Sequence, residues 1–427
     1  IQWMDPSTAE LLENVFAQVA SQPVLIAATA RPGPPPRWLE NGSTVSIHLD
    51  RLSPEETTAL VRRILSDSQP FTETVRAIVE RCDGIPIFAE ELTRGYAAGV
   101  AEGRSEELVS NIPATLAESI MARLDRLTDG RRIASTAAAI GREFPVALLT
   151  AVSGLPEKIV QSGIRELLEA GIIMPGYSPF GTAVCFRQML IRDAAYQLLL
   201  RKDRTGLHNV IVRTLRERFP AVAEDMPHIV AMQLFLAGDM AASAQEWLRA
   251  GLAATRRSAY GEAVKHLRSG LDATARLPES DARDRAEIAL RTTLIGALIP
   301  SEGYRSPAVE TEMELTLAAS VRSGATESLV LGLYSKWIVL GSTGNVGAAL
   351  ELALKMRDIA ASGSEVDRLI AWRACGTTLL FSARLHEAIE QYDLFMAHFD
   401  EARHGEALRT MHGDIALMVM LGLAEAH

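Results

Sequence analysis

The chain has 427 residues, of which 48% are apolar, enough for two or three domains with packed cores. A formal net charge of -10 argues against a protein that binds nucleic acid nonspecifically. Cys82, Cys185 and Cys375 are far apart in the sequence, which indicates neither a disulfide framework nor a metal site and favours a reducing, cytoplasmic environment. No apolar run is long enough to cross a bilayer.

The first part of the chain alternates helix and strand patterns. Asp5, followed by a proline, is the expected N-cap of a helix over residues 6–19. The apolar residues 23–30 predict a buried strand, and residues 45–49 predict a second, shorter one. This alternation is typical of an α/β fold with a parallel sheet.

A helix, a break and a second helix follow in residues 75–92. Gly84 is the expected left-handed end of the first helix, and Pro86 begins the second helix, where its missing N–H is not needed. Glu90 and Glu91 could suggest acid/base chemistry, but an exposed, solvated helix turn is the simpler interpretation.

The middle of the chain has a different pattern, with several helices followed by two short apolar runs. Those runs, 172–177 and 183–186, predict a β-hairpin, and helices closed by a hairpin are typical of a winged helix. The candidate recognition helix, 156–170, balances acids and bases, so packing against the preceding α/β part is favoured over DNA contact. The helical patterns cover 115–127, 130–140, 145–152 and 156–170.

From about residue 226 the chain is helical and rich in alanine. Three similar segments begin at Tyr260, Val346 and Leu385. Ala348 and Ala388 are about 40 residues apart, which indicates helical-pair repeats that form a tetratricopeptide-like solenoid. A plain helical bundle is the alternative.

Two well-known catalytic motifs are missing from the sequence. It contains no Gly-x-x-x-x-Gly-Lys-Ser/Thr loop for nucleotide phosphates and no Gly-x-Ser-x-Gly elbow. None of the nine histidines pairs with another at metal-ligand spacing, so no metal site is expected.

The order of several short motifs resembles STAND proteins, the signal-transduction ATPases related to AAA+ proteins. The motifs are Trp3-Met4-Asp5-Pro6-Ser7-Thr8, Thr29-Ala30-Arg31-Pro32, Gly84-Ile85-Pro86 and the segment from Phe186 to Tyr196. The resemblance implies the C-terminal half of an α/β P-loop NTPase domain, then a winged helix whose helix 156–170 packs against this ATPase core, then an all-α solenoid. The corresponding ranges are 1–111, 112–222 and 223–427, with both ends expected to be incomplete.

The resemblance also assigns nucleotide-site residues. Arg31 matches a γ-phosphate sensor, and Gly84 and Pro86 match an element beside the adenine. Asp5 lies near the site, where a helix cap is the simpler role. Gln188 replaces the histidine that reaches ADP in relatives, so the hold on ADP is expected to be weaker. The cofactor implied is ATP or ADP with Mg²⁺ in the full-length protein, whereas these residues alone should neither bind it tightly nor catalyse.

The implied function is an ATP-dependent switch in which the solenoid binds a protein or a small ligand. The effector would be a domain of the same protein, of which a class III adenylate/guanylate cyclase is the most common example in the family. One alternative is a transcriptional regulator of the maltose-regulator type, which predicts a helix-turn-helix effector. Another is a repeat scaffold with a decayed ATPase part. Neither a membrane nor a nucleic acid is an expected partner of this segment.

Overall fold

The computed structural model describes residues 4, 6–19, 24–25, 27–30, 45, 47–65, 72–101, 115–177, 181–409 and 415–426. The chain divides into two compact units. One unit is residues 44–220, and the other combines residues 1–43 with residues 221–427. In the described part, no helix is both long and apolar enough to cross a membrane. The predicted domain boundary at 111/112 falls outside the described residues, and the predicted domains stay predictions.

The unit of residues 44–220 begins with a small three-helix bundle. Its buried core includes Val61, Ile78 and Leu92, one side chain from each helix. Pro86 is the first residue of α4, as the sequence predicts, and Pro54 is the first residue of α2. The helices are α2 (Pro54–Leu65), α3 (Thr72–Cys82) and α4 (Pro86–Ala101).

Helices and a small antiparallel sheet follow in the same unit. The strand order is β1-β3-β2, and Phe144 on β1 lies opposite Val184 on β3. β2 and β3 form the predicted hairpin, with Ile173 opposite Phe186. The rings of Phe144 and Phe186 meet in the core at a centroid distance of 5.8 Å. In chain order the elements are α6 (Leu116–Asp125), α7 (Asp129–Ile140), β1 (Glu143–Pro145), α8 (Val146–Ser153), α9 (Glu157–Glu169), β2 (Ile173–Gly176), β3 (Ala183–Phe186), α10 (Met189–Gln197) and α11 (Arg201–Arg218).

The two strands predicted at 23–30 and 45–49 are not formed in the described residues. Residues 24–25, 27–30, 45 and 47–49 have no regular structure, and Leu25 and Leu49 are 94% and 90% exposed. A strand needs hydrogen-bonded neighbours on its edges, and the sheet of the described residues uses only β1, β2 and β3. By contrast, the predicted helix over 6–19 is present as α1 (Pro6–Val19).

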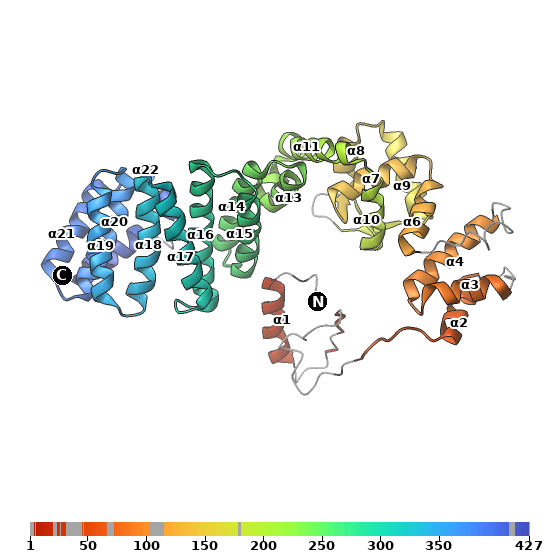
Figure 1. Cartoon of the computed structure of the whole chain (residues 1–427), viewed down its shortest axis with the longest axis horizontal. Coiled ribbons are helices and arrows are strands. Elements are labelled where there is room, and N and C mark those ends of the chain that lie inside the picture. Colours follow the sequence, from red (N-terminus) through yellow and green to blue (C-terminus); the bar gives the residue numbers. More distant parts are fainter. Residues whose placement is uncertain are drawn as a thin grey trace. The chain divides into compact units, whose positions relative to one another are not determined.

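The second half of the chain is a helical solenoid, in which antiparallel helices stand side by side in a row (Figure 1). From α13 to α21 each helix packs on its neighbours in sequence. α14, α16, α18, α20 and α23 also contact one another in that order and form one layer of the solenoid. The helices are α12 (Pro220–Asp225), α13 (Pro227–Ala237), α14 (Met240–Arg256), α15 (Tyr260–Ala275), α16 (Asp281–Glu302), α17 (Pro307–Ser323), α18 (Thr326–Ser342), α19 (Val346–Ala360), α20 (Glu365–Phe381), α21 (Leu385–His398), α22 (Glu401–Arg409) and α23 (Ile415–Ala426).

One turn recurs at four helix junctions of the solenoid. A residue with positive φ ends the first helix, and the next residue donates its N–H to a carbonyl of that helix at 3.0 Å, as in a Schellman motif. The positive-φ residues are Gly238, Ser258, Gly344 and Ala383. Five residues further on is a small side chain that is fully buried: Ser243, Ala263, Ala349 and Ala388.

This shared turn corrects the predicted register of the repeat. The residue equivalent to Ala263 and Ala388 is Ala349 rather than Ala348, because the helix starts at Val346 and the buried position is its fourth residue. The small residues allow close helix contact: a Cβ on Gly376 of α20 would lie 2.5 Å from the ring of Tyr392 on α21. The predicted helical pairs are therefore present.

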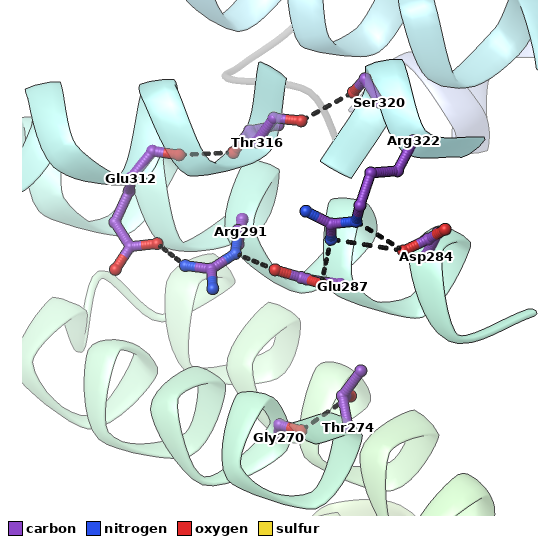
Figure 2. A network of polar contacts seen from close by, with 9 residues as sticks. All are labelled: Gly270, Thr274, Asp284, Glu287, Arg291, Glu312, Thr316, Ser320 and Arg322. Carbon is purple, nitrogen blue, oxygen red and sulfur yellow. Dashed lines mark hydrogen bonds and ion pairs between the residues drawn. The ribbon is translucent and has the colours of Figure 1, made fainter. Parts of the chain in front are cut away.

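An ion-pair network connects α16 to α17 (Figure 2). Arg291 binds Glu287 at 2.8 Å and Glu312 at 2.5 Å. Arg322 binds Asp284 at 3.3 Å and Glu287 at 2.9 Å. Only 15% of the Arg291 side chain is exposed. The two carboxylates neutralise its positive charge, which would otherwise be costly to bury.

Candidate functional site

The turn between α3 and α4 requires a glycine at position 84. Gly84 has a φ of +69°, and its carbonyl accepts a hydrogen bond of 2.8 Å from the N–H of Leu52. A Cβ on Gly84 would lie 2.4 Å from the Leu52 carbonyl oxygen. Both the backbone conformation and the close approach therefore exclude larger residues. The side chain of Arg51 also binds Asp83, so the turn is held against the residues that precede α2.

Pro86 follows this turn as the first residue of α4. Pro86 is exposed, and Ile85 beside it is 38% exposed, so the Gly-x-Pro turn presents a rigid apolar surface. A surface of this kind could contact a flat base such as adenine, which is the role that the family resemblance gives it.

A buried ion pair connects α4 to α6. Glu91 is fully buried and binds Arg123, of which 11% is exposed. Arg123 also donates through Nη2 to the carbonyl of Ala170, which follows α9, at 2.7 Å. Arg126 donates to the carbonyl of Gly95 at 3.3 Å. These bonds tie the three-helix bundle of α2–α4 to the helices that carry the sheet.

The expectation that Glu90 and Glu91 form a solvated turn is therefore wrong for Glu91. Glu90 faces Arg94 at 3.1 Å and is partly exposed, as expected. Glu91, one position further round the helix, points toward α6 and is buried with Arg123. The missed signal is its position beside Leu92 and Phe88, which belong to the buried face of α4.

The candidate recognition helix, α9, uses an acidic side chain to cap a neighbour. Oε2 of Glu166 accepts hydrogen bonds of 3.0 Å from the backbone N–H groups of Thr128 and Gly130 at the start of α7. A carboxylate is favourable there because it meets the positive end of the helix dipole. A Cβ on Gly163 would lie 2.6 Å from Ile133, so α9 also packs closely on α7. These contacts hold α9 against α7, and packing of α9 against the ATPase core stays a prediction.

Gln188 occupies the N-cap position of α10 with extended backbone angles, but its side chain does not cap that helix. Its Oε1 atom is buried and accepts no hydrogen bond from the described residues. No hydrogen bond within the described part joins Gln188 to Gly84 or Pro86. The other two predicted site residues, Asp5 and Arg31, lie outside the described residues.

Two further polar clusters lie in the solenoid. His228 and His266 stack at 5.2 Å between ring centroids, and Trp247 stacks on His266 at 5.4 Å. Burial, followed by the neighbouring His228 and the cations Lys265 and Arg257, lowers the pKa of His266 to about 4. Burial and Arg257 also lower the pKa of His228. No group of three or more metal-ligating side chains occurs among the described residues.

The second cluster surrounds Arg373 on α20, which is only 8% exposed. Its guanidinium donates to the Tyr334 hydroxyl at 2.8 Å and lies over the ring of Trp337 at 4.7 Å. A sequence signal exists, because Arg373 interrupts the apolar run Leu369-Ile370-Ala371-Trp372-Arg373-Ala374-Cys375. An apolar run with one arginine indicates a helix that is buried around most of its circumference, so this arginine is a candidate for burial.

The chain is similar to a protein of known sequence and to a solved structure. An uncharacterized protein of Rhizobium meliloti (strain 1021) is 26% identical over 99% of this chain, and the chain spans 42% of that protein's length. A crystal structure described as a STAND protein with a tetratricopeptide repeat sensor, from Pyrococcus horikoshii, aligns over 91% of this chain and 58% of its own. That likeness has 12% identity and a TM-score of 0.34. No protein-family model matches the chain.

Proposed function

We propose that these residues form the regulatory part of a STAND-class signal-transduction ATPase. The motif order and the Gly84 turn, held by Leu52 and linked through Glu91 and Arg123 to the sheet-bearing helices, support this proposal most directly. The order α7, β1, α8, α9, β2, β3 is that of a winged helix, which is the assignment we propose for this part.

The proposed mechanism is a nucleotide-dependent switch. ATP or ADP with Mg²⁺ would contact the Gly84–Pro86 turn and the Arg31 guanidinium in the complete protein. Exchange of ADP for ATP would change the position of α4, and the Glu91–Arg123 pair would transmit that change to the winged helix. The solenoid would bind a protein or small ligand and bias the equilibrium.

The effector that we favour is a nucleotide cyclase in the same protein, acting in the cytoplasm. The transcriptional regulator and the repeat scaffold remain the competing proposals. A helix-turn-helix domain in the complete reading frame would favour the regulator. Absence of nucleotide binding by the complete protein would favour the scaffold.

Nucleotide titration of the complete protein that contains these residues tests the proposal. We expect ATP and ADP to bind with Mg²⁺, and Arg31→Ala to slow hydrolysis more than it weakens ADP binding, because a γ-phosphate sensor does not contact ADP. Gln188→His should tighten ADP binding by adding a donor that can carry charge. Wild-type protein that binds neither nucleotide would refute the switch.

A further inference from the structure

The Arg373 cluster consists of Arg373, Tyr334, Trp337 and Met418, which come from α20, α18 and α23. Arg373 donates through Nη1 to the Tyr334 hydroxyl at 2.8 Å and through Nη2 to Sδ of Met418 at 3.0 Å. Its guanidinium carbon lies 4.7 Å from the ring centroid of Trp337 and 5.5 Å from that of Tyr334. The Nε atom is buried and has no hydrogen-bond partner in the described residues.

The positive charge of this cluster has no ion-pair partner in the part of the chain that the structure describes. An arginine stays protonated at any relevant pH, so it cannot lose its charge to escape burial. Arg373 forms no ion pair with a carboxylate of the described residues, although it is 8% exposed. Arg291, which is more exposed at 15%, has two carboxylates. The aromatic faces and the thioether offer only partial compensation, because thioether sulfur is a weak acceptor.

The unsatisfied atoms share one edge of the guanidinium. Nη1 is occupied by the Tyr334 hydroxyl, whereas Nε has no partner in the described part and Nη2 has only the Met418 sulfur. Nε–H and the adjacent Nη2–H are the two parallel donors that a planar carboxylate accepts side-on. Nη1 is bound to Tyr334, and the rings of Tyr334 and Trp337 lie beside the guanidinium, so the Nε/Nη2 edge is the part that lacks a strong acceptor among the described residues.

We propose that the Nε/Nη2 edge of Arg373 binds the carboxylate of a ligand, which displaces the Met418 thioether. Met418 is 44% exposed, and a methionine side chain has several rotatable bonds, so the edge can open toward solvent. A monoanionic carboxylate balances the single positive charge. A dianionic phosphate would leave a net negative charge beside Trp337 and Tyr334, which is costly at a buried site.

This inference rests on the proposed function in one respect, since it names the chemical class of ligand that a sensing solenoid would bind. Ligand binding at Arg373 would join α18, α20 and α23 through one guanidinium. The three helices lie consecutively in one layer of the solenoid, so their relative positions would become more fixed when the carboxylate is bound.

The test is calorimetric titration of the 427-residue chain with benzoate, inorganic phosphate, and a peptide with either a free or an amidated C-terminus. We expect benzoate or the peptide with the free C-terminus to bind, and phosphate not to bind. Binding of benzoate alone indicates a small ligand. Binding of the free but not the amidated peptide indicates a protein C-terminus. Arg373→Gln should weaken binding by about 10- to 100-fold, since two charge-assisted hydrogen bonds are lost. Arg291→Gln, the matched control, should leave it unchanged.

Met418→Ala keeps the test decisive if Arg373→Gln fails to fold. Removal of the thioether should preserve or tighten carboxylate binding. The proposal is overturned if no carboxylate binds wild type or Met418→Ala, if phosphate binds equally well, or if Arg373→Gln binds as wild type does. Nucleotide is absent throughout, so failure here leaves the proposed switch untouched.

Discussion

Two regions of this molecule each bury an arginine, and they treat its charge differently. In residues 44–220, Arg123 is 11% exposed and binds the fully buried Glu91, which ties two helices together. In the solenoid, Arg373 is 8% exposed and binds only neutral groups of the described residues. Arg123 therefore serves as a structural connection, as Arg291 does in the solenoid, whereas we propose that Arg373 is an available donor.

The difference has a physical origin in how each region is held together. The first region joins a three-helix bundle to a helix-and-sheet unit, and such unlike surfaces need specific polar contacts. The solenoid repeats one turn and one buried small residue at four helix junctions, so close packing of small side chains holds the helices together there. A buried charge there is not required for the repeat, which favours a binding role for Arg373.

The largest effect is expected from breaking the Glu91–Arg123 pair. Glu91→Ala leaves Arg123 buried without its counter-ion, which should destabilise residues 44–220 by about 3–5 kcal/mol. All five tryptophans have positions outside residues 44–220, so tryptophan fluorescence does not report the unfolding of this unit. Hydrogen exchange is therefore the suitable measurement. Glu90→Ala, which removes a partly exposed partner of Arg94, should cost at most about 1 kcal/mol. Equal effects of the two variants would contradict a special role for Glu91.

A smaller loss is expected from adding a side chain at the Gly84 turn. Gly154→Ala, at a φ of +63° with open space around it, should cost about 1–2 kcal/mol from backbone strain alone. Gly84→Ala, at +69°, should cost more because its Cβ would also meet the Leu52 carbonyl oxygen. Hydrogen exchange measures the two losses of stability, in α2 and α4 for the Gly84 variant and in α8 and α9 for the Gly154 variant. A Gly84 variant no worse than the Gly154 variant would show that the turn is not held against Leu52.

The solenoid should lose stability in weak acid through His266. Its pKa is 6.5 when unfolded and about 4 when folded, so the unfolded chain binds more protons between these values. Stability therefore falls as the pH drops from about 6.5 to about 4. His266→Phe should reduce this fall in a tryptophan-detected melting series, whereas His386→Phe, at an exposed position, should not. Parallel curves for wild type and His266→Phe would exclude this residue as the cause.

The smallest effect concerns thiol chemistry. Cys82 and Cys375 are buried, and burial raises the pKa of Cys375 to about 12, so neither should react in the native protein. Cys185 is partly exposed and should react slowly, because burial first and Glu143 second raise its pKa. Mass spectrometry after treatment with iodoacetamide identifies the modified residue. Early labelling of Cys375 would mean that the core around α19 and α20 opens.

The sequence predicts the local structure better than the contacts between elements. The helix start at Pro86, the hairpin and the turn at Gly84 follow from short-range rules of capping and backbone freedom, and all three are present. The strands at 23–30 and 45–49 are not formed in the described residues, because a strand depends on neighbours that local patterns do not specify.

The candidate sites depended still more on tertiary contacts. Glu91 and Glu90 are adjacent and chemically identical, and only the packing of α4 on α6 buries one and exposes the other. The pairing of Arg123 with Glu91 joins residues 32 positions apart, which no periodicity reveals. Roles for Arg31, Gly84, Pro86 and Gln188 in nucleotide binding stay predictions.

Hydrogen exchange of the complete protein with bound ADP and with a non-hydrolysable ATP analogue tests the central proposal most directly. The switch predicts that protection at the contact between α4 and α6, around Glu91 and Arg123, differs between the two nucleotides, and that Glu91→Ala abolishes the difference. The same protection with both nucleotides, although both bind, would contradict the switch.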